Sequence, residues 1–434
     1  MTPPPSRARF PRRSKGSHRV RSARSRSAAV LLVLAGGLLG WGMPRWERHL
    51  PEAGLGFDAS TAQATLAAIA GGMITLAGFI VTAITLIVQT VQAMSPRLVS
   101  ALGHFSRYLV LFGLLIGTAL FALVVLSQVR DDDVPRASVT LAVGLVLVDS
   151  VIVLRLLDSL RHAVTGGGLA RAVGDRLRTV IDQAYPQDPE APPRLSVDQS
   201  PTAVRVPVLH HGRPAVILAI DEPKLVRIAA RHHVRVRFVR AVGDFVAEPA
   251  KIAFLEPARP GGGVDRKLAE HVAACVRYGP SRTVEQDTAY GFRLLADISV
   301  RSLSPAVNDP TTAVQALDQI EDALVRLAGR SLGDAWLLDD TGAPSVSYPA
   351  PRWQDFISLA LDETLLYGAM NPQVARRVRA LLAHVAAAAP KDRLAPVGER
   401  LDALNRMVTA AMHDPLLRDV SGTADPQGLG GPSG

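Results

Sequence analysis

The small and polar residues between Ala59 and Pro96 fall on one stripe of a helix. The segment contains no charged residue, and these residues recur at alternating steps of three and four, the spacing of a single helical face. An apolar run of this length predicts a membrane-spanning helix, and we expect the stripe to face away from lipid. The stripe comprises Thr61, Ala64, Ala68, Gly71, Thr75, Gly78, Thr82, Thr85, Gln89 and Gln92.

Further apolar segments predict a transmembrane domain over residues 28–164, with spans at about 28–43, 61–94, 108–129 and 137–157. The first segment is short and Gly-rich, which fits either a retained anchor or a cleaved signal sequence. It lacks a convincing cleavage site, so we expect an anchor.

Charge in the connecting loops predicts the orientation. The loop between the second and third segments is basic, whereas the next loop carries three consecutive aspartates, Asp131 to Asp133. Loops rich in Lys and Arg stay on the cytoplasmic side. We therefore expect a multi-pass protein of the plasma membrane with its N- and C-termini in the cytoplasm.

The stripe has two interpretations. Small residues allow helices to pack closely, whereas a polar lining would serve ions or a small solute in a pore completed by oligomerisation. Gly and Ala dominate the outer half, which favours packing, and Thr and Gln dominate the inner half, where a pore should be sought. The candidate residues are Thr75, Gly78, Thr82, Thr85, Gln89 and Gln92.

Asp149 lies beyond the middle of the fourth segment. A carboxyl group inside a membrane is costly, so an intramembrane acid is a candidate functional residue. In the alternative, the span ends early and Asp149 lies near the headgroups. Arg155, Asp158 and Arg161 would then continue as an amphipathic helix.

The formal net charge of +9 is concentrated at the N-terminus. Residues 1–27 carry nine basic and no acidic side chains, so the rest of the chain is neutral. We expect this segment to be a disordered tail that binds anionic lipid headgroups and not nucleic acid. The single Cys275 excludes an intramolecular disulfide.

The sequence thus predicts an α-helical multi-pass membrane domain followed by an α+β cytoplasmic domain. Within the cytoplasmic part, we expect helices at 266–277 and 284–300, and a small hairpin near 337–348 that interrupts the helices. The divisions are a helix with a Pro-rich linker over 165–202, a β-rich module over 203–258, a helical domain over 264–415 and a disordered tail over 416–434.

No familiar catalytic chemistry is encoded. The chain has no Walker loop, dinucleotide fingerprint, nucleophile elbow or zinc spacing. The adjacent histidines at 210–211 and 232–233 would point to opposite faces of a strand, which does not suit one metal ion. We therefore expect no metal, no cofactor and no enzymatic activity.

The densest polar motif is RSLSPAVNDPTT, from Arg301 to Thr312. Asp309 followed by Pro310 predicts a helix N-cap, which explains only part of the motif. The remaining polar groups could hold an anion or polar ligand at the helix start. With the preceding helix start, the candidate cytoplasmic site comprises Arg282, Gln286, Asp287, Arg301, Ser304, Asn308 and Asp309.

Three stretches carry a family resemblance: GGMITLAGFIVTAITLIVQTVQAMSPRLV (71–99), GDFV (243–246) and RTVEQDTAYGFRLLADISVRSLSPAVNDPTTAVQALDQIEDAL (282–324). Over residues 28–390 the chain resembles bacterial predicted membrane proteins of domain of unknown function 2254. The resemblance implies several N-terminal spans and a cytoplasmic domain. It implies no catalytic or binding residue.

Three functions of different classes fit these features. We expect an oligomeric channel- or transporter-like protein, with the stripe as lining and the cytoplasmic domain as regulator. The alternative is a membrane-anchored sensor or scaffold whose cytoplasmic domain binds a ligand or partner. A membrane-bound hydrolase or transferase is the third, and no motif supports it. Both leading hypotheses place a homo-oligomer in the lipid bilayer.

Overall fold

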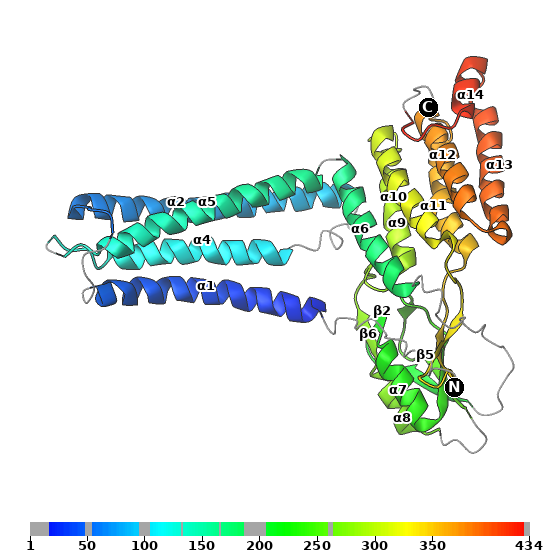
Figure 1. Ribbon diagram of the computed structural model, residues 1–434, viewed down its shortest axis with the longest axis horizontal. Helices are drawn as coiled ribbons and strands as arrows, with labels where there is room; N and C mark the ends of the chain where they lie inside the picture. Colours follow the sequence, from blue (N-terminus) through cyan, green and yellow to red (C-terminus); the bar gives the residue numbers. More distant parts are fainter. Residues whose placement is uncertain are drawn as a thin grey trace, which may run out of the picture. The chain divides into compact units, whose positions relative to one another are not determined.

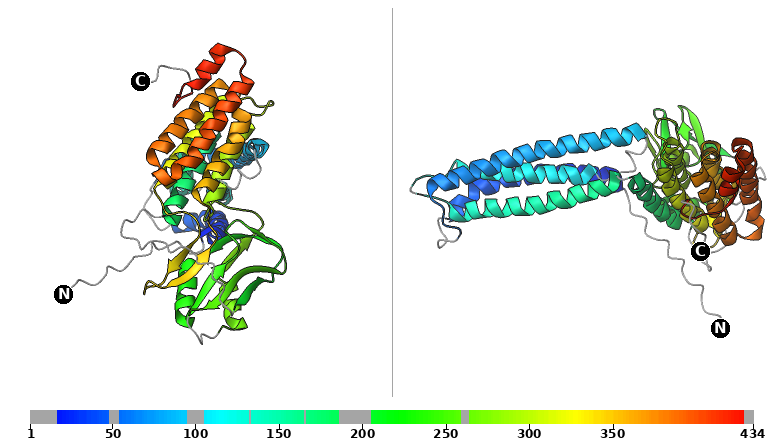
Figure 2. Two further views of the ribbon diagram at one scale, coloured as in Figure 1. Left: turned by 90° about the vertical axis from the view of Figure 1, so that its right-hand side faces the viewer. Right: turned by 90° about the horizontal axis from the view of Figure 1, so that it is seen from above.

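A computed structural model describes residues 17–47, 54–94, 105–131, 133–164, 166–185, 205–258 and 264–428 of the 434-residue chain. The residues group into two compact units, which we call the N-terminal unit (within Arg12–Gly168) and the C-terminal unit (containing Leu169–Gly434). The first is a bundle of long helices, and the second combines helices with sheets (Figure 1, Figure 2).

The bundle consists of α1 (Ser17–Glu47), α2 (Ala59–Met94), α4 (Phe105–Leu126) and α5 (Arg136–Val164). All four contain a stretch long and apolar enough to cross a membrane: Ser25–Glu47, Ala59–Leu86, Tyr108–Leu126 and Arg136–Asp158. The prediction of four apolar helices near the N-terminus is confirmed. The expected disorder of residues 17–27 is wrong, because these residues form the start of α1, where Ala and Arg favour a helix. Residues 1–16 lie outside the described residues.

Glycines bring α1 and α4 into close contact. Gly36 and Gly40 on α1 face α4, and Gly113 and Gly117 on α4 face α1. A Cβ atom at Gly113 would lie 2.6 Å from the Cα of Ala29. Each helix thus uses a Gly-x-x-x-Gly pair, which lets two backbones approach closely where larger side chains could not fit.

The remaining helices pack through larger apolar side chains. Two buried clusters lie along the bundle, one around Leu66, Phe121 and Val139, the other around Met73 and Leu115. Leu66 and Met73 lie on one face of α2 together with Ala62, Ala70, Ala77 and Ile80. This face accounts for the packing of α2 within the chain.

Polar contacts join the helix ends on one side of the bundle. The Glu47 carboxylate at the end of α1 accepts hydrogen bonds from the Ser138 amide (3.0 Å) and hydroxyl (2.8 Å) at the start of α5. The Gln128 side chain donates to the Gly40 carbonyl (2.8 Å) and accepts from Arg45 (2.7 Å). These bonds satisfy the free amide donors at a helix start and fix the ends of three helices.

The C-terminal unit holds two sheets. Its five-stranded sheet has the order β1-β5-β3-β8-β7, and its three-stranded sheet has the order β4-β2-β6. Alternate residues of β3 (Val234, Val236 and Phe238) are buried in the core. The strands are β1 (Val206–His210), β2 (Ala215–Ile220), β3 (Val234–Phe238), β4 (Phe245–Val246), β5 (Ala250–Pro257), β6 (Val276–Gly279), β7 (Ala335–Leu338) and β8 (Pro344–Tyr348).

Three sheet strands, β6, β7 and β8, come from outside the expected β-rich module. The hairpin of β7 and β8 adds to the five-stranded sheet, where β8 pairs parallel with β3 through Val236 and Val346. It therefore does not merely interrupt the helices. The helix expected at 266–277 is also shorter, because α8 ends at Ala273 and Val276 already pairs with Ile220 of β2.

Most helices of the C-terminal unit form a group on one side of the sheets, whereas α7 and α8 pack against the sheets themselves (Figure 1). The Arg377 guanidinium, 3% exposed, binds Asp318 (2.8 Å) and Glu321 (2.6 Å) and so joins α12 to α10. The helices are α6 (Gly166–Ala184), α7 (Glu222–His232), α8 (Arg266–Ala273), α9 (Thr288–Ser302), α10 (Pro310–Ala328), α11 (Trp353–Gly368), α12 (Pro372–Ala388), α13 (Leu394–Ala411) and α14 (Pro415–Gly422).

The end of the chain is more ordered than its composition indicated. The expectation of disorder over 416–434 is wrong for residues 416–428. Asp414 caps α14, and the side chains of Arg376 and Arg379 on α12 donate to the carbonyls of Val420 and Ser421, both at 2.7 Å. Residues 429–434 and the Pro-rich linker from 186 lie outside the described residues.

Candidate functional site

The stripe of α2 faces outward from the bundle. Its residues lie on the opposite side of the helix from the buried Leu66, Met73 and Ile80. A Cβ atom at Gly71 or Gly78 would meet nothing within 4 Å among the described residues. The stripe therefore takes no part in packing among the described residues of this chain. The exposed members are Thr61, Ala64, Ala68, Gly71, Thr75, Gly78, Thr82, Thr85 and Gln89, and the side chain of Gln92 lies outside the described residues.

The threonine hydroxyls of the stripe turn back to their own helix. Thr75 donates to the Gly71 carbonyl (2.8 Å), Thr82 to Gly78 (3.1 Å) and Thr85 to Val81 (2.9 Å). Each bond satisfies the hydroxyl donor and leaves the lone pairs of the oxygen as acceptors on the outer surface. The stripe therefore offers a row of uncharged acceptors.

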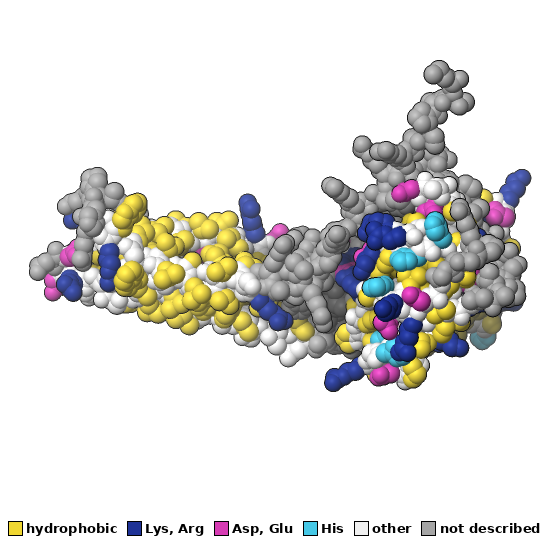
Figure 3. Space-filling view, turned by 90° about the horizontal axis from the view of Figure 1, so that it is seen from below, with side chains coloured by type: hydrophobic (Ala, Val, Ile, Leu, Met, Phe, Trp, Pro, Cys, Tyr) yellow, Lys and Arg dark blue, Asp and Glu magenta, His cyan; other side chains and the backbone are white. Residues whose placement is uncertain are grey.

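α2 is longer than a bilayer requires. Its 36 residues give a length of about 54 Å, against a hydrocarbon core of about 30 Å. The apolar, uncharged sequence of α2 continues past Leu86 through Ile87, Val88 and Val91, so Gln89 and Gln92 lie within the same uncharged helix. Figure 3 shows the predominantly hydrophobic surface on one side of the bundle.

Asp149 lies inside the bundle. Its side chain is 0% exposed, and Val146 and Val153, which share its face of α5, belong to the apolar cluster with Met73 and Leu115. Thr118 of α4, 3% exposed, is the hydroxyl residue that interacts with its carboxyl group. Neither carboxyl oxygen makes a hydrogen bond of full geometry to the described residues.

Two of the distinctive motifs meet in the C-terminal unit. The Asp287 carboxylate caps α9 by accepting from the Tyr290 amide (2.9 Å), and it pairs with the Arg282 guanidinium at 2.7 Å. Gly243 of the GDFV turn lies directly against this pair with φ +95°. Burial raises the pKa of Asp287, and the charge of Arg282 opposes that shift. The pair thus anchors the GDFV turn to the start of α9.

Gln286 also has a structural role. Its amide oxygen accepts from the Ile220 amide (2.9 Å), and its amide nitrogen donates to the Ile220 carbonyl (3.4 Å). These two hydrogen bonds take the place of those that a neighbouring strand would make with the Ile220 backbone at the end of β2. Gln286 therefore joins the three-stranded sheet to the segment before α9.

The remaining candidates for a polar site lie at the other end of α9. Asp309 caps α10 by accepting from the Thr312 amide (3.1 Å) and hydroxyl (2.6 Å), and Asn308 takes a left-handed conformation with φ +47°. Arg301 is exposed and Ser304 is partly exposed in the same turn. Since α9 has 15 residues, about 22 Å separate this turn from the Arg282–Asp287 pair. The seven candidates therefore form two groups, and the structure does not bring them into one site.

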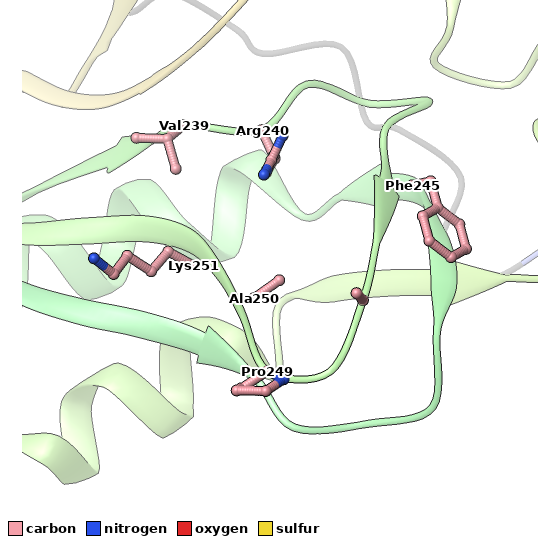
Figure 4. A pocket seen from close by; sticks show the side chains of 7 residues that line it. Val239, Arg240, Phe245, Pro249, Ala250 and Lys251 are labelled. Atoms are coloured by element: carbon pink, nitrogen blue, oxygen red, sulfur yellow. The ribbon is translucent and has the colours of Figure 1, made fainter.

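A shallow hollow of about 650 Å³ lies beside the GDFV turn (Figure 4). Arg240 and Lys251 line it together with apolar side chains. Among the described residues no group of three or more His, Cys, Asp or Glu side chains could hold a metal ion. His210 instead binds the Arg213 carbonyl (3.0 Å) and stacks on Tyr278, with ring centroids 4.3 Å apart.

The chain combines four helices long and apolar enough to cross a membrane with a unit of helices and sheets, as a predicted helical membrane protein does. The chain belongs to the family described as predicted membrane protein (DUF2254), whose model matches residues 26–384. The family resemblance read from the sequence is confirmed.

The curated relatives share this chain's sequence over part of their length. Uncharacterized proteins of Mycobacterium tuberculosis strain H37Rv and of Mycobacterium bovis are 28% identical over 260 residues, which is 58% of this chain and 49% of each relative. The chain thus matches about half the length of these relatives. No solved structure matches the chain.

Sequence reasoning missed three contacts that the structure shows. The glycines of the α1–α4 contact had a signal, since Gly36 and Gly40, like Gly113 and Gly117, are spaced four apart. The contact of Gly243 had a weaker signal, because Gly-Asp marks a turn. The proximity of Thr118 to Asp149 had none, since it depends on how α4 and α5 pack.

Proposed function

We propose that this protein assembles into a homo-oligomer in the membrane through the outward stripe of α2, and that the threonine-rich part of the stripe lines a path for ions or small solutes. The observation that supports this proposal is the exposure of the stripe on the side of α2 opposite its packing face. The C-terminal unit then acts as a cytoplasmic regulator, with both termini on the cytoplasmic side.

The contrast between the two sets of glycines supports an assembly. Gly36 and Gly117 are used for close packing inside the bundle, whereas Gly71 and Gly78 have open space around them. A lipid-facing helix gains nothing from a row of glycine, because lipid fills such a surface less tightly than a second helix does. A second copy of α2 would use the row for close approach.

The acceptor row supports a polar path. Thr75, Thr82 and Thr85 have satisfied donors and outward lone pairs, which suit water or cations. Hydroxyl oxygens at successive turns of several copies would form rings around a common axis. Because α2 carries no charge, its hydroxyl oxygens would bind a solute weakly at several successive positions. Weak binding suits conduction, since a solute must leave each site as readily as it enters.

Cysteine crosslinking in membranes tests the assembly. In a Cys275→Ser background, Gly78→Cys should form crosslinked dimers on oxidation. The matched control is Phe79→Cys, which is also exposed but lies about 100° around the helix from Gly78. Equal crosslinking at both positions, or none at Gly78, would contradict an interface on the stripe.

Solute flux in reconstituted vesicles tests the path. Wild-type protein should release trapped ions or small solutes, and Thr82→Leu or Thr85→Leu should reduce the release, while Val81→Leu should not. Crosslinking at Gly78 without any flux would support the scaffold or sensor function in place of a pore.

A further inference from the structure

The N-terminal unit buries one carboxyl group among apolar side chains. Asp149 on α5 is 0% exposed and lies on the same helical face as Val146 and Val153. Met73 and Ala77 of α2 and Leu115 and Ala119 of α4 belong to the same apolar cluster. Asp149 therefore lies where α2, α4 and α5 pack together.

The carboxyl group is also deep along the span. The apolar stretch of α5 runs from Arg136 to Asp158. Asp149 is about 20 Å from the first of these residues along the helix and about 14 Å from the second. Arg155, the nearest charged residue of α5, is about 9 Å along the helix, so Asp149 lies inside a hydrocarbon core of about 30 Å, nearer to the Arg155 side.

Among the described side chains, the helices around Asp149 offer it no positive partner; Arg161 and His162 of α5 lie about 18 Å or more farther along the helix. α2 contains no ionisable residue. On α4 the ionisable residues are Arg107 and Tyr108 in the first turn, about 15 Å along the helix from Thr118. On α5 itself Arg155 is exposed and points away, since six residues correspond to about 240° of rotation.

α1 contributes charge only toward its ends. Its ionisable residues nearest the middle are Arg26 and Arg45, with Glu47 beyond. Arg45 binds Gln128 and stacks on Trp41, and Glu47 binds the start of α5. The middle of α1, which meets Gly113 and Gly117 of α4, carries no ionisable side chain.

We propose that Asp149 is a proton-binding site in the membrane-spanning bundle: its carboxyl group holds a proton at neutral pH, with the Thr118 hydroxyl as its polar partner. An isolated carboxylate in an apolar interior is strongly disfavoured, and protonation removes the charge. Release of the proton to water leaves an aspartate carboxylate and needs no other reactant. The site does not depend on the pore proposed for α2.

The coordination available fits a proton better than a metal cation. Calcium and magnesium ions require six or more oxygen ligands. Asp149 and Thr118 supply a single carboxyl and a single hydroxyl group, and the described residues hold no cluster of metal-ligating side chains. A proton needs one acceptor oxygen.

Carbodiimide labelling of the full chain in lipid vesicles tests the proposal. Dicyclohexylcarbodiimide enters apolar regions and reacts with protonated carboxyl groups, and mass spectrometry locates the adduct. We expect an adduct at Asp149 at neutral pH, its loss in Asp149→Asn and its retention in Asp158→Asn. Above the titration of the group, labelling should fall about tenfold per pH unit. A folded protein without an adduct at Asp149 would overturn the proposal.

Thermal unfolding of the same variants gives an independent measurement. Asn is neutral and similar in shape to the protonated acid, so Asp149→Asn should fold and keep its Tm at low pH. The unfolded chain releases the proton near pH 4 whereas the folded chain keeps it, so wild-type stability should fall as pH rises from about 5 to about 8, relative to Asp149→Asn. Parallel pH profiles for the two proteins would show that Asp149 holds no proton in the fold.

Discussion

Gly117 of α4 lies against the backbone of Leu32 in α1: a Cβ atom at Gly117 would be 2.7 Å from the Leu32 carbonyl oxygen. This contact explains why α1, which is exposed along most of its length, nevertheless joins the bundle. α1 has few large side chains to bury against α4, so backbone proximity replaces side-chain packing.

Gly117→Val should therefore weaken the bundle. The added side chain would overlap the Leu32 carbonyl, which only a shift of a helix can relieve, and we expect a loss of about 1–3 kcal/mol. Thermal unfolding in detergent micelles measures it. Gly37→Val on α1, where a Cβ atom meets open space, is the matched control. Equal destabilisation by both variants would contradict a role for glycine in the α1–α4 contact.

Gly243→Ala should disturb the junction of the GDFV turn with α9. The residue has φ +95°, and a Cβ atom there would lie 2.8 Å from the Arg282 Nε atom and against the Asp287 carboxylate. We expect a loss of about 2–3 kcal/mol, from backbone strain and from displacement of the ion pair. Gly342→Ala has similar strain at φ +81° but open space around its Cβ atom, so it should cost only about 1 kcal/mol. If the two variants unfold at the same temperature, the contact with Arg282 and Asp287 has no effect.

Asp287→Ala should destabilise the protein more than Asp309→Ala. Both aspartates cap a helix, which is worth about 1 kcal/mol, but Asp287 also pairs with Arg282 at a position only 4% exposed. Its removal leaves the guanidinium without its carboxylate, so we expect about 2–4 kcal/mol against about 1 kcal/mol. Denaturant unfolding of the full chain in micelles compares them. A larger loss of unfolding free energy for Asp309→Ala would contradict the structural role assigned to the Arg282–Asp287 pair.

The pair of Arg293 on α9 and Glu363 on α11 should make part of the stability depend on pH. Arg293 donates to Glu363 at 2.9 Å and holds the pKa of that carboxyl below its ordinary value of 4.5. Because the folded-state pKa is lowered, the stabilisation is present above about pH 4.5 and is lost as pH falls through the folded-state pKa.

Glu363→Gln should remove this dependence. The pair is partly exposed, so the loss at neutral pH should be small, about 0.5 kcal/mol or about 1–2 °C in Tm. At low pH, where Glu363 is protonated, the stabilities of the variant and the wild type should become equal. The double variant Arg293→Met with Glu363→Gln isolates the contribution of the pair. A stability difference between Glu363→Gln and the wild type that is the same at all pH values would contradict the proposed pH dependence.

The membrane helices were predictable because their signal is local. The period of α2 can be read from its own residues, and it gave both the helix and the stripe. The direction in which the stripe faces could not be read, because Gly71 and Gly78 look alike whether a helix of the same chain or of another copy lies against them. The glycine pairs of α1 and α4 carried the same spacing signal, and in their case the partner is within the chain.

The candidate polar residues around α9 show a second limit of prediction from the sequence. Asp309 and Pro310 specify a helix start by themselves, so the start of α10 was predictable. The positions of Arg282 and Asp287 depend on Gly243, about forty residues earlier, and no local pattern reports such a contact. For the same reason the sequence suggested one polar site where the fold separates two helix ends.

The parallel pairing of β3 with β8 has a consequence for synthesis. Val236 pairs with Val346, so about 110 residues must leave the ribosome before one edge of β3 is covered, roughly 5–20 s at ordinary elongation rates. During that time an open strand edge can pair with another nascent chain. Fragments that end before Tyr348 would keep this edge open permanently, and expression of the C-terminal unit should therefore include the whole segment through β8.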